Sequence, residues 1–186
     1  GVVLMVAMIM LIIISLLAAI TVRNATSSEG INANLRQTQL ATQAAETALR
    51  YCEDAAINLV NDGTGTFAFT SPSGSAISAL ALANVAASPA LGTTSTAVVT
   101  TNWDTTTDNG QLILPIATVN LSGVSTTFAR PPECMIQRAI PDVAESYLSV
   151  LTITSRGFGP EVPAADNSRT RPIGSEVWLQ STLELQ

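Results

Sequence analysis

The sequence opens on VVLMVAMIMLIIISLLAAITV, which spans Val2–Val22, and the rest of the chain is organised around this stretch. It has no charged residue, its only polar side chains are Ser15 and Thr21, and Arg23 ends it. At 1.5 Å per residue, an α-helix of this length is roughly 30 Å long, about the thickness of a bilayer's hydrocarbon core. A helix that is apolar on all sides is stable in lipid and also inside a bundle of similar helices. We therefore predict a membrane-type helix here.

A cleaved signal peptide is the alternative interpretation of the same stretch. We reject it because no basic region precedes the apolar run, and because the run exceeds the roughly 7–15 residues of a signal-peptide core. The chain also starts at Gly1 instead of Met. We expect from this that processing has already occurred and that the apolar helix was kept.

The composition narrows the class of protein. The chain has 186 residues, so about 160 lie beyond the apolar segment, enough for one domain with its own core. A net charge of −6 without a basic cluster argues against a nucleic-acid partner. The absence of His removes Ser-His and Cys-His catalysis and most zinc sites. We predict a protein without catalytic residues, cofactor or metal.

The apolar run continues without proline, so residues 1–60 are predicted to form one long helix. Residues 23–34 are rich in Thr, Ser and Asn, which lower helix propensity, so the helix either continues weakly or frays there, and we expect a soft joint. The helix should stop near Asn61-Asp62-Gly63. Residues 35–60 carry a stripe of small apolar residues that allows close packing on a sheet: Ala41, Ala44, Ala45, Ala48, Cys52, Ala55, Ala56 and Leu59.

The last third of the chain indicates an antiparallel sheet. Strand-like segments lie at Cys134–Ile140, Tyr147–Arg156 and Glu176–Leu185. The last segment alternates apolar and polar residues, and Trp178 falls on its polar side. An 18-residue connection, Gly157–Gly174, precedes it, and loops of that length are usually functional or mobile.

The middle of the chain carries weaker signals. Pro115 weakens one of its strand candidates, because proline cannot donate to a sheet ladder. We predict a strand at Thr66–Thr70, a helix at Ala76–Ala87, and strands at Ala97–Trp103, Gln111–Ile116 and Ala117–Leu121. The fold class is α+β.

Three stretches of the chain resemble type IV pilins, and in particular the PilX-type minor pilins. They are GVVLMVAMIML at 1–11, NLR at 34–36 with QAAETALR at 43–50, and LTITSRGFG at 151–159 with VWLQST at 177–182. The resemblance implies a lollipop-like fold with a long N-terminal α-helix packed on a C-terminal antiparallel β-sheet. The expected parts are a transmembrane or filament-core helix at 1–23, its amphipathic continuation at 24–60, and a globular head at 61–186.

The resemblance also implies a structural role. Such a subunit is processed by prepilin peptidase, waits in the bacterial inner membrane, and is packed by the pilus assembly machinery into an extracellular filament with other pilin subunits. Both a repeating subunit and a PilX-like minor pilin stay open. The expected filament-core residues are Val2, Leu4, Met5, Ile9, Ile13 and Leu17.

One position departs from the family pattern. Pilins usually carry Glu at mature position five, where it pairs with the amine of a neighbouring chain. Here that position is Met5, or Val6 if Gly1 is the last leader residue. Neither side chain can neutralise an amine. The departure fits a minor pilin near a filament tip, and it also fits a filament held by apolar packing.

The two cysteines suggest a disulfide. Cys52 lies on the small-residue stripe and Cys134 opens a strand, so outside the cytoplasm they can tie helix to sheet. By loop entropy such a bond is worth roughly 4–5 kcal/mol. The alternative is two buried free thiols.

Few other residues invite a specific role. Asp104 and Asp108 lack the spacing of a calcium loop, and we favour an Asx-type turn. Trp178 is either a subunit contact or an ordinary exposed aromatic. Arg169, Arg171 and Asp166 are expected to be solvated in the long connection, where surface recognition is also possible. The competing function is a single-pass, membrane-anchored periplasmic binding domain or enzyme, which would need a ligand pocket.

Overall fold

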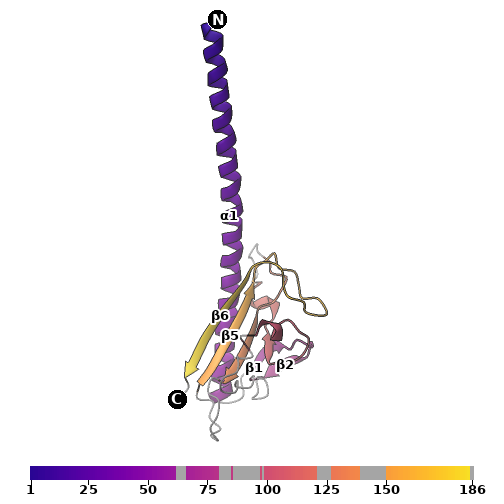
Figure 1. The fold of residues 1–186 in the computed structure, drawn as a ribbon. Helices are drawn as coiled ribbons and strands as arrows, with labels where there is room; N and C mark the ends of the chain where they lie inside the picture. Colours follow the sequence, from indigo (N-terminus) through magenta and orange to yellow (C-terminus); the bar gives the residue numbers. More distant parts are fainter. Residues whose placement is uncertain are drawn as a thin grey trace. The chain divides into compact units, whose positions relative to one another are not determined.

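The computed structural model describes residues 1–61, 66–79, 85, 97, 99–120, 127–138 and 150–184. The chain forms two compact units, Gly1–Arg36 and Gln37–Gln186, which we call the N-terminal and C-terminal units. The elements, labelled in part in Figure 1, are helix α1 (Val2–Asn61), strands β1 (Thr66–Thr70), β2 (Ala76–Ala79), β3 (Gln111–Ile113), β4 (Glu133–Arg138), β5 (Val150–Phe158) and β6 (Glu176–Glu184), and short 3₁₀ helices η2 (Thr100–Asn102) and η3 (Ile116–Thr118).

The N-terminal unit is entirely helical after Gly1. The backbone stays helical through residues 23–34 despite their polar composition. Of the two alternatives for this stretch, continuation of the helix is therefore the one observed. Helix α1 ends at Asn61, the first residue of the predicted helix end at Asn61-Asp62-Gly63. Asp62 and Gly63 lie outside the described residues.

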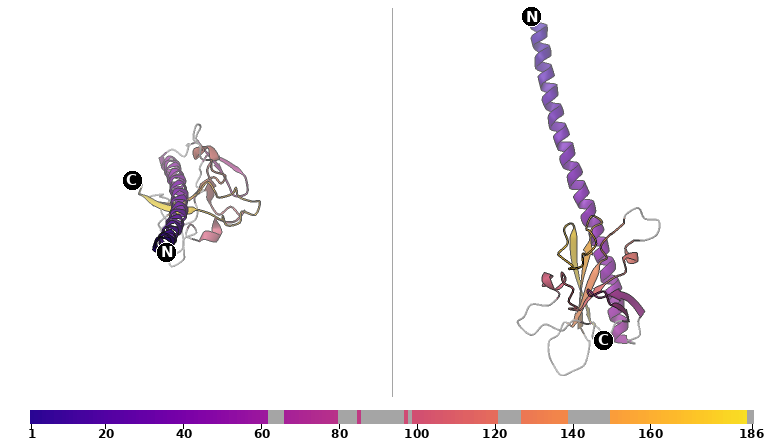
Figure 2. Two further views of the ribbon diagram at one scale, coloured as in Figure 1. Left: turned by 90° about the horizontal axis from the view of Figure 1, so that it is seen from above. Right: turned by 90° about the vertical axis from the view of Figure 1, so that its right-hand side faces the viewer.

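The C-terminal unit is built on a six-stranded antiparallel sheet of order β2-β1-β3-β4-β5-β6. Strands β5 and β6 pair over their full length, from Val150 opposite Glu184 to Phe158 opposite Glu176. The C-terminal part of α1 lies along one face of this sheet, which we call the inner face (Figures 1 and 2). The predicted α+β fold, with a long N-terminal helix packed on an antiparallel sheet, is confirmed.

The helix packs on the sheet through small residues, as the stripe predicted. Ala41, Ala45 and Ala48 are fully buried, and the stripe stays buried down to Leu59. On β5, Gly157 passes so close that a Cβ there would lie 2.7 Å from Ala45 Cα. Ser155 on the same face donates from Oγ to the Ala45 carbonyl at 2.9 Å. Close contact of helix and strand backbones therefore fixes this interface.

The predicted disulfide between Cys52 and Cys134 is present, with the two Cα atoms 6.6 Å apart. Both cysteines are fully buried in the core between α1 and the inner face. The bond joins α1 to β4 across 82 residues of sequence. Further along the helix, Tyr51 packs edge-on against Phe67 and Phe69 of β1. Helix and sheet are thus tied covalently and by packing.

The predicted helix at Ala76–Ala87 is wrong over its first four residues. Those residues form β2, which pairs with β1 across a tight turn in which Ser71 N donates to Ser75 O at 2.8 Å. Gly74 takes a φ of 89°, which the turn requires and glycine permits. Pairing with β1 therefore overrides the helix propensity of alanine. Of the remaining positions, only Val85 is among the described residues.

Two predicted strands are replaced by 3₁₀ turns. In Ala97–Trp103, residues 100–102 form η2, and Trp103 turns its ring into the interior with Nε1 donating to Ala97 O at 3.0 Å. In Ala117–Leu121, the first two residues belong to η3 instead of a strand. Pro115 precedes this turn, and its carbonyl accepts a hydrogen bond from Thr118 Oγ1 at 2.7 Å. Leu121 lies outside the described residues.

The other strands lie near their predicted positions. The Thr66–Thr70 strand is found as β1, and the Gln111–Ile116 strand ends early, at Ile113. Strand β4 begins at Glu133, and β5 runs two residues beyond Arg156. The predicted ends at 139–140, 147–149 and 185 fall outside the described residues.

Candidate functional site

Among the residues that the structure describes, the most exposed apolar surface lies on the N-terminal unit. Within Val2–Val22, large apolar side chains keep between 50% (Ile13) and 83% (Val3) of their surface accessible. The helix is long and apolar enough to cross a membrane, judged by length and composition. Monomeric soluble proteins rarely expose apolar surface on this scale, so the stretch needs lipid or other apolar chains around it. The residues predicted for a filament core, Val2, Leu4, Met5, Ile9, Ile13 and Leu17, are all exposed here.

The two polar side chains of this stretch are bonded within the helix itself. Ser15 Oγ donates to Ile12 O at 2.8 Å, and Thr21 Oγ1 lies 2.9 Å from Ala18 O. Because hydroxyl donors left unpaired in lipid cost several kcal/mol, such back-bonding suits a dry environment. No carboxylate lies in the stretch, and Met5 and Val6 present only apolar surface.

The outer face of the sheet, opposite α1, carries a buried cluster of charged residues. Alternation along β5 places Arg156 and Phe158 on this face, while Ser155 and Gly157 meet the helix. Arg156 is fully buried and donates from Nη2 to Glu133 Oε2 at 2.8 Å. Its Nη1 donates to Asp104 at 2.9 Å and to Glu176 at 3.3 Å. One guanidinium thus joins β4, β5, β6 and the segment after η2.

Three aromatic rings surround the same guanidinium. Arg156 Cζ lies 5.4 Å from the Trp103 ring centroid, 5.0 Å from Phe158 and 5.2 Å from Trp178. Burial acts to lower the pKa of Arg156, but Glu133 and Asp104 outweigh it and raise that pKa. The charge is therefore permanent and well compensated.

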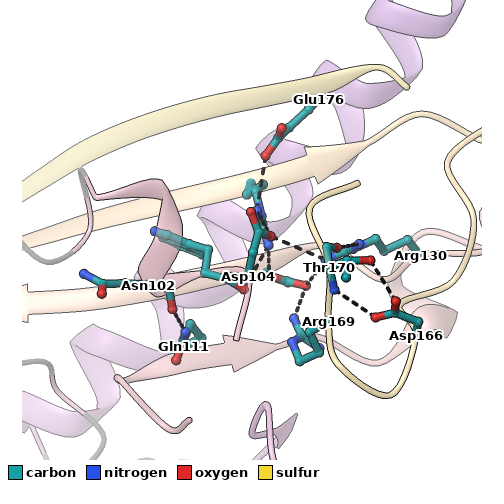
Figure 3. Close-up of polar contacts among 11 residues, drawn as sticks. Asn102, Asp104, Gln111, Arg130, Asp166, Arg169, Thr170 and Glu176 are labelled. Carbon is teal, nitrogen blue, oxygen red and sulfur yellow. Dashed lines mark hydrogen bonds and ion pairs between the residues drawn. The ribbon is translucent and has the colours of Figure 1, made fainter. Parts of the chain in front are cut away.

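Glu133 is the shared anion of the cluster. It is fully buried. Its Oε1 accepts a hydrogen bond from Arg169 Nη2 at 2.5 Å, and its Oε2 accepts one from Arg156 Nη2. Arg130 lies 3.8 Å from the same carboxylate. Figure 3 labels four residues of the cluster, Asp104, Arg130, Arg169 and Glu176, which come from separate segments of the chain. Removing one partner of a buried ion pair typically costs about 3–5 kcal/mol, so Glu133 holds the outer layer together.

Arg130 is the least satisfied cation of the cluster. It is 3% exposed and stacks over Phe158, with Cζ 4.7 Å from the ring centroid. Its Nε and Nη2 have no hydrogen-bond partner among the described residues. Burial lowers the pKa of Arg130, and attraction to Glu133 offsets this only in part. The cluster is a structural core, with its charges directed at one another.

The structure changes the interpretation of several predicted site residues. Arg169 was expected to be solvated but is 7% exposed, because it reaches inward to Glu133. Asp166 and Arg171 are exposed, as expected. Trp178 is half-buried, and its ring meets Trp103 edge-on at a centroid distance of 5.0 Å. Its role as a subunit contact stays a prediction.

The two aspartates considered for calcium are used in other ways. Asp104 pairs with Arg156 at 2.9 Å. Asp108 accepts from Ser73 N at 3.2 Å and from Ser73 Oγ at 3.0 Å. Within the described residues, no group of three or more His, Cys, Asp or Glu side chains is arranged to hold a metal ion. Asp108 also borders an open hollow of about 260 Å³, lined by Ser71, Ser75, Ile77, Asp108, Gly110, Gln111 and Leu112.

The buried cluster was missed by the sequence analysis. Part of its signal was present, because Arg156 is the last residue of the predicted strand Tyr147–Arg156 and Glu133 directly precedes the predicted strand that begins at Cys134. Strand alternation places both side chains on the face of the sheet opposite α1. Taken alone, that alternation predicts a solvent-exposed face. In the folded chain, this face is covered by the Gly159–Ser175 connection and by the segment after η2. No local sequence pattern shows that these distant segments lie there.

Comparison with known proteins gives a family match. Residues 1–50 match the family described as PilX N-terminal. No curated protein and no solved structure matches the chain. The matched segment contains the exposed apolar stretch and the first half of the small-residue stripe. Residues 1–50, with their hydrophobic helix, thus match the PilX N-terminal domain, and the fold of a long helix on an antiparallel sheet is pilin-like.

Proposed function

We propose that this chain is a structural subunit of a type IV pilus-like extracellular filament. The observation that carries the proposal is the helical stretch Val2–Val22, which is uncharged, exposed on all sides and part of the PilX-type match. Before assembly this stretch holds the chain in the bacterial inner membrane. In the filament it packs against the same stretch of other pilin subunits.

Shielding this stretch from water stabilises it strongly. Burying a Val, Leu, Ile or Met side chain stabilises by roughly 1.5–3 kcal/mol relative to water. Lipid already supplies this gain, so transfer from membrane to filament exchanges one apolar surrounding for another. The six core positions, Val2, Leu4, Met5, Ile9, Ile13 and Leu17, then contact neighbouring helices. This exchange allows one segment to serve first as an anchor and later as the filament core.

In this proposal, the position of each helix along the filament axis is set by how its side chains pack against neighbouring helices. With Met5 and Val6 where pilins usually carry an acid, no charge pair is available inside the bundle. Small residues within the stretch, at Ala7, Ala18 and Ala19, are the positions where a neighbouring helix can approach most closely. The C-terminal unit remains in water, where the disulfide and the outer-face cluster keep it rigid.

Immunogold electron microscopy of material sheared from cells that express the full chain tests the proposal. Antibody against the C-terminal unit should label filaments, along their length for a repeating subunit and at one end for a minor pilin. Ile13→Arg, in the middle of the apolar stretch, should abolish labelled filaments. The matched Ala33→Arg change, at an exposed position beyond the stretch, should leave them. Label confined to membrane fragments, without filaments, supports an anchored binding domain and rejects the proposal.

A further inference from the structure

The long connection between β5 and β6 is closed at its base. Gly159 N donates to Ser175 O at 2.9 Å, and Ser175 N donates to Glu161 Oε1 at 2.7 Å. Val162 is fully buried beneath it. Gly174 takes a φ of 133°, and a Cβ there would lie 2.7 Å from Val162 Cγ2. Hydrogen bonds and packing therefore hold the base of the connection, although its length is typical of a mobile loop.

The far end of the connection is also fixed. Arg169 has a φ of 52°, unusual for a residue with a side chain, and Glu133 holds its guanidinium at 2.5 Å. Thr170 donates to Asp166 through N at 2.8 Å and through Oγ1 at 2.7 Å. Such backbone conformations cost about 1–3 kcal/mol and persist only where the surroundings enforce them. Figure 3 shows Arg169, Thr170 and Asp166 side by side.

Ile173, on this connection, is unusually exposed for a large apolar residue. It is 86% exposed, whereas Ile57 and Ile116, the other exposed large apolar residues described in the C-terminal unit, are each 37% exposed. Pro172 restricts the backbone directly before it. Arg171 is exposed two positions earlier. The connection thus presents an apolar and a cationic side chain together, on a backbone that is already ordered.

The surface of the C-terminal unit has the opposite charge. Three of its arginines are buried in the outer-face cluster, so they do not contribute to the surface. On its described residues outside this connection, four exposed carboxylates, Glu46, Asp54, Asp108 and Glu184, outnumber two exposed arginines, Arg50 and Arg138. The connection itself also carries the exposed Glu161 and Asp166. Arg171 is therefore complementary to the acidic surface of another copy of the same chain.

We infer that Arg171–Ile173 is a docking element for a second copy of this chain, an inference that rests on the proposed filament role. Ile173 is buried against the neighbour, and Arg171 pairs with its carboxylates. Because the connection is ordered beforehand, docking avoids the entropy cost of fixing a loop. A tip that meets a different surface on its neighbour is a heterologous contact, and such contacts build an open filament when the rotation between copies does not close a ring.

Site-specific photocrosslinking in cells tests the inference. A benzophenone amino acid at position 173 of the full chain should give an ultraviolet-dependent crosslink between two copies. The same probe at Asn167, exposed on the same connection, should give none. Arg171→Glu should reduce the crosslink from position 173 several-fold, and circular dichroism of the purified variant checks that the fold is intact.

The outcomes separate this inference from the proposed function. A crosslink from position 173 only to a different protein, or equal crosslinking from 167, overturns the docking element. Labelled filaments without a crosslink from 173 overturn it as well, while leaving the filament role intact. A self-crosslink in cells that form no filaments supports the docking element and rejects the filament role.

Discussion

Replacing Gly157 by Ala tests how closely the helix and the sheet approach. A Cβ at this position would lie 2.7 Å from Ala45 Cα, and closer still to Ala45 N and Ala41 O. Carbon atoms in contact normally lie about 3.5–4.0 Å apart, so helix and strand must separate by roughly 1 Å. All three obstacles are backbone atoms of α1, which no side-chain rotation can move away.

The expected cost follows from this geometry. An extra methyl group in a packed interface costs about 1–3 kcal/mol, and a backbone obstacle places the cost in the upper half of that range. The loss of glycine freedom in the unfolded chain returns about 0.4–1 kcal/mol. The free energy of unfolding should therefore fall by about 2 kcal/mol. For a chain of this size, the melting temperature should fall by about 4–8 °C.

The effect is measured by thermal unfolding of the full chain in detergent. Near-ultraviolet circular dichroism of Trp103 and Trp178 monitors the transition. Gly159→Ala is the matched control, because a Cβ there would meet the carboxylate end of Glu161, a side chain that can rotate away at the cost of its hydrogen bond from Ser175 N. The control should lose less than about half as much stability as Gly157→Ala. A Gly157→Ala chain as stable as the wild type, or less perturbed than Gly159→Ala, refutes the close approach of helix and strand.

Three further predictions follow from the C-terminal unit. Glu133→Gln should lower the free energy of unfolding by about 3–5 kcal/mol in urea titrations, whereas the exposed Glu184→Gln should change it by less than about 0.5 kcal/mol; equal effects would contradict a central role for the buried carboxylate. Reduction of the disulfide should cost roughly 4–5 kcal/mol by the same assay, and a loss below about 1 kcal/mol would contradict the loop-entropy account. Partial burial acts to raise the pKa of Glu161, but hydrogen bonds from Ser175 outweigh it and hold that pKa below 4.5. The stabilisation is therefore complete above pH 4.5 and lost as the pH falls through the lowered pKa, so the Ser175 amide resonance should shift in that acidic range, and Glu161→Gln should abolish the shift.

Much of the helix and of the inner core was predictable from sequence. An uncharged run such as Val2–Val22 has few structural solutions, and a stripe of alanines at helical spacing identifies the buried side of α1. The alternation in β6 and the setting of Cys52 and Cys134 were equally local signals. In each case the side chains alone indicate which face is buried.

The outer face was not predictable in the same way. Arg156 and Glu133 are buried only because distant segments cover them, and a strand pattern treats that face as solvent. The Ala76–Ala79 segment failed for a related reason, since its pairing with β1 outweighs alanine's helix propensity. Arg169 shows the limit most clearly, because a loop arginine looks solvated until its buried partner is known.

Helical reconstruction by cryo-electron microscopy of filaments from cells expressing this chain tests the central claim most directly. The account predicts a filament in which Val2–Val22 of each copy lies in a central bundle of helices, shielded from solvent, with the C-terminal units outside. Filaments whose centre excludes this stretch, or preparations that contain only dispersed detergent-bound particles, would contradict it.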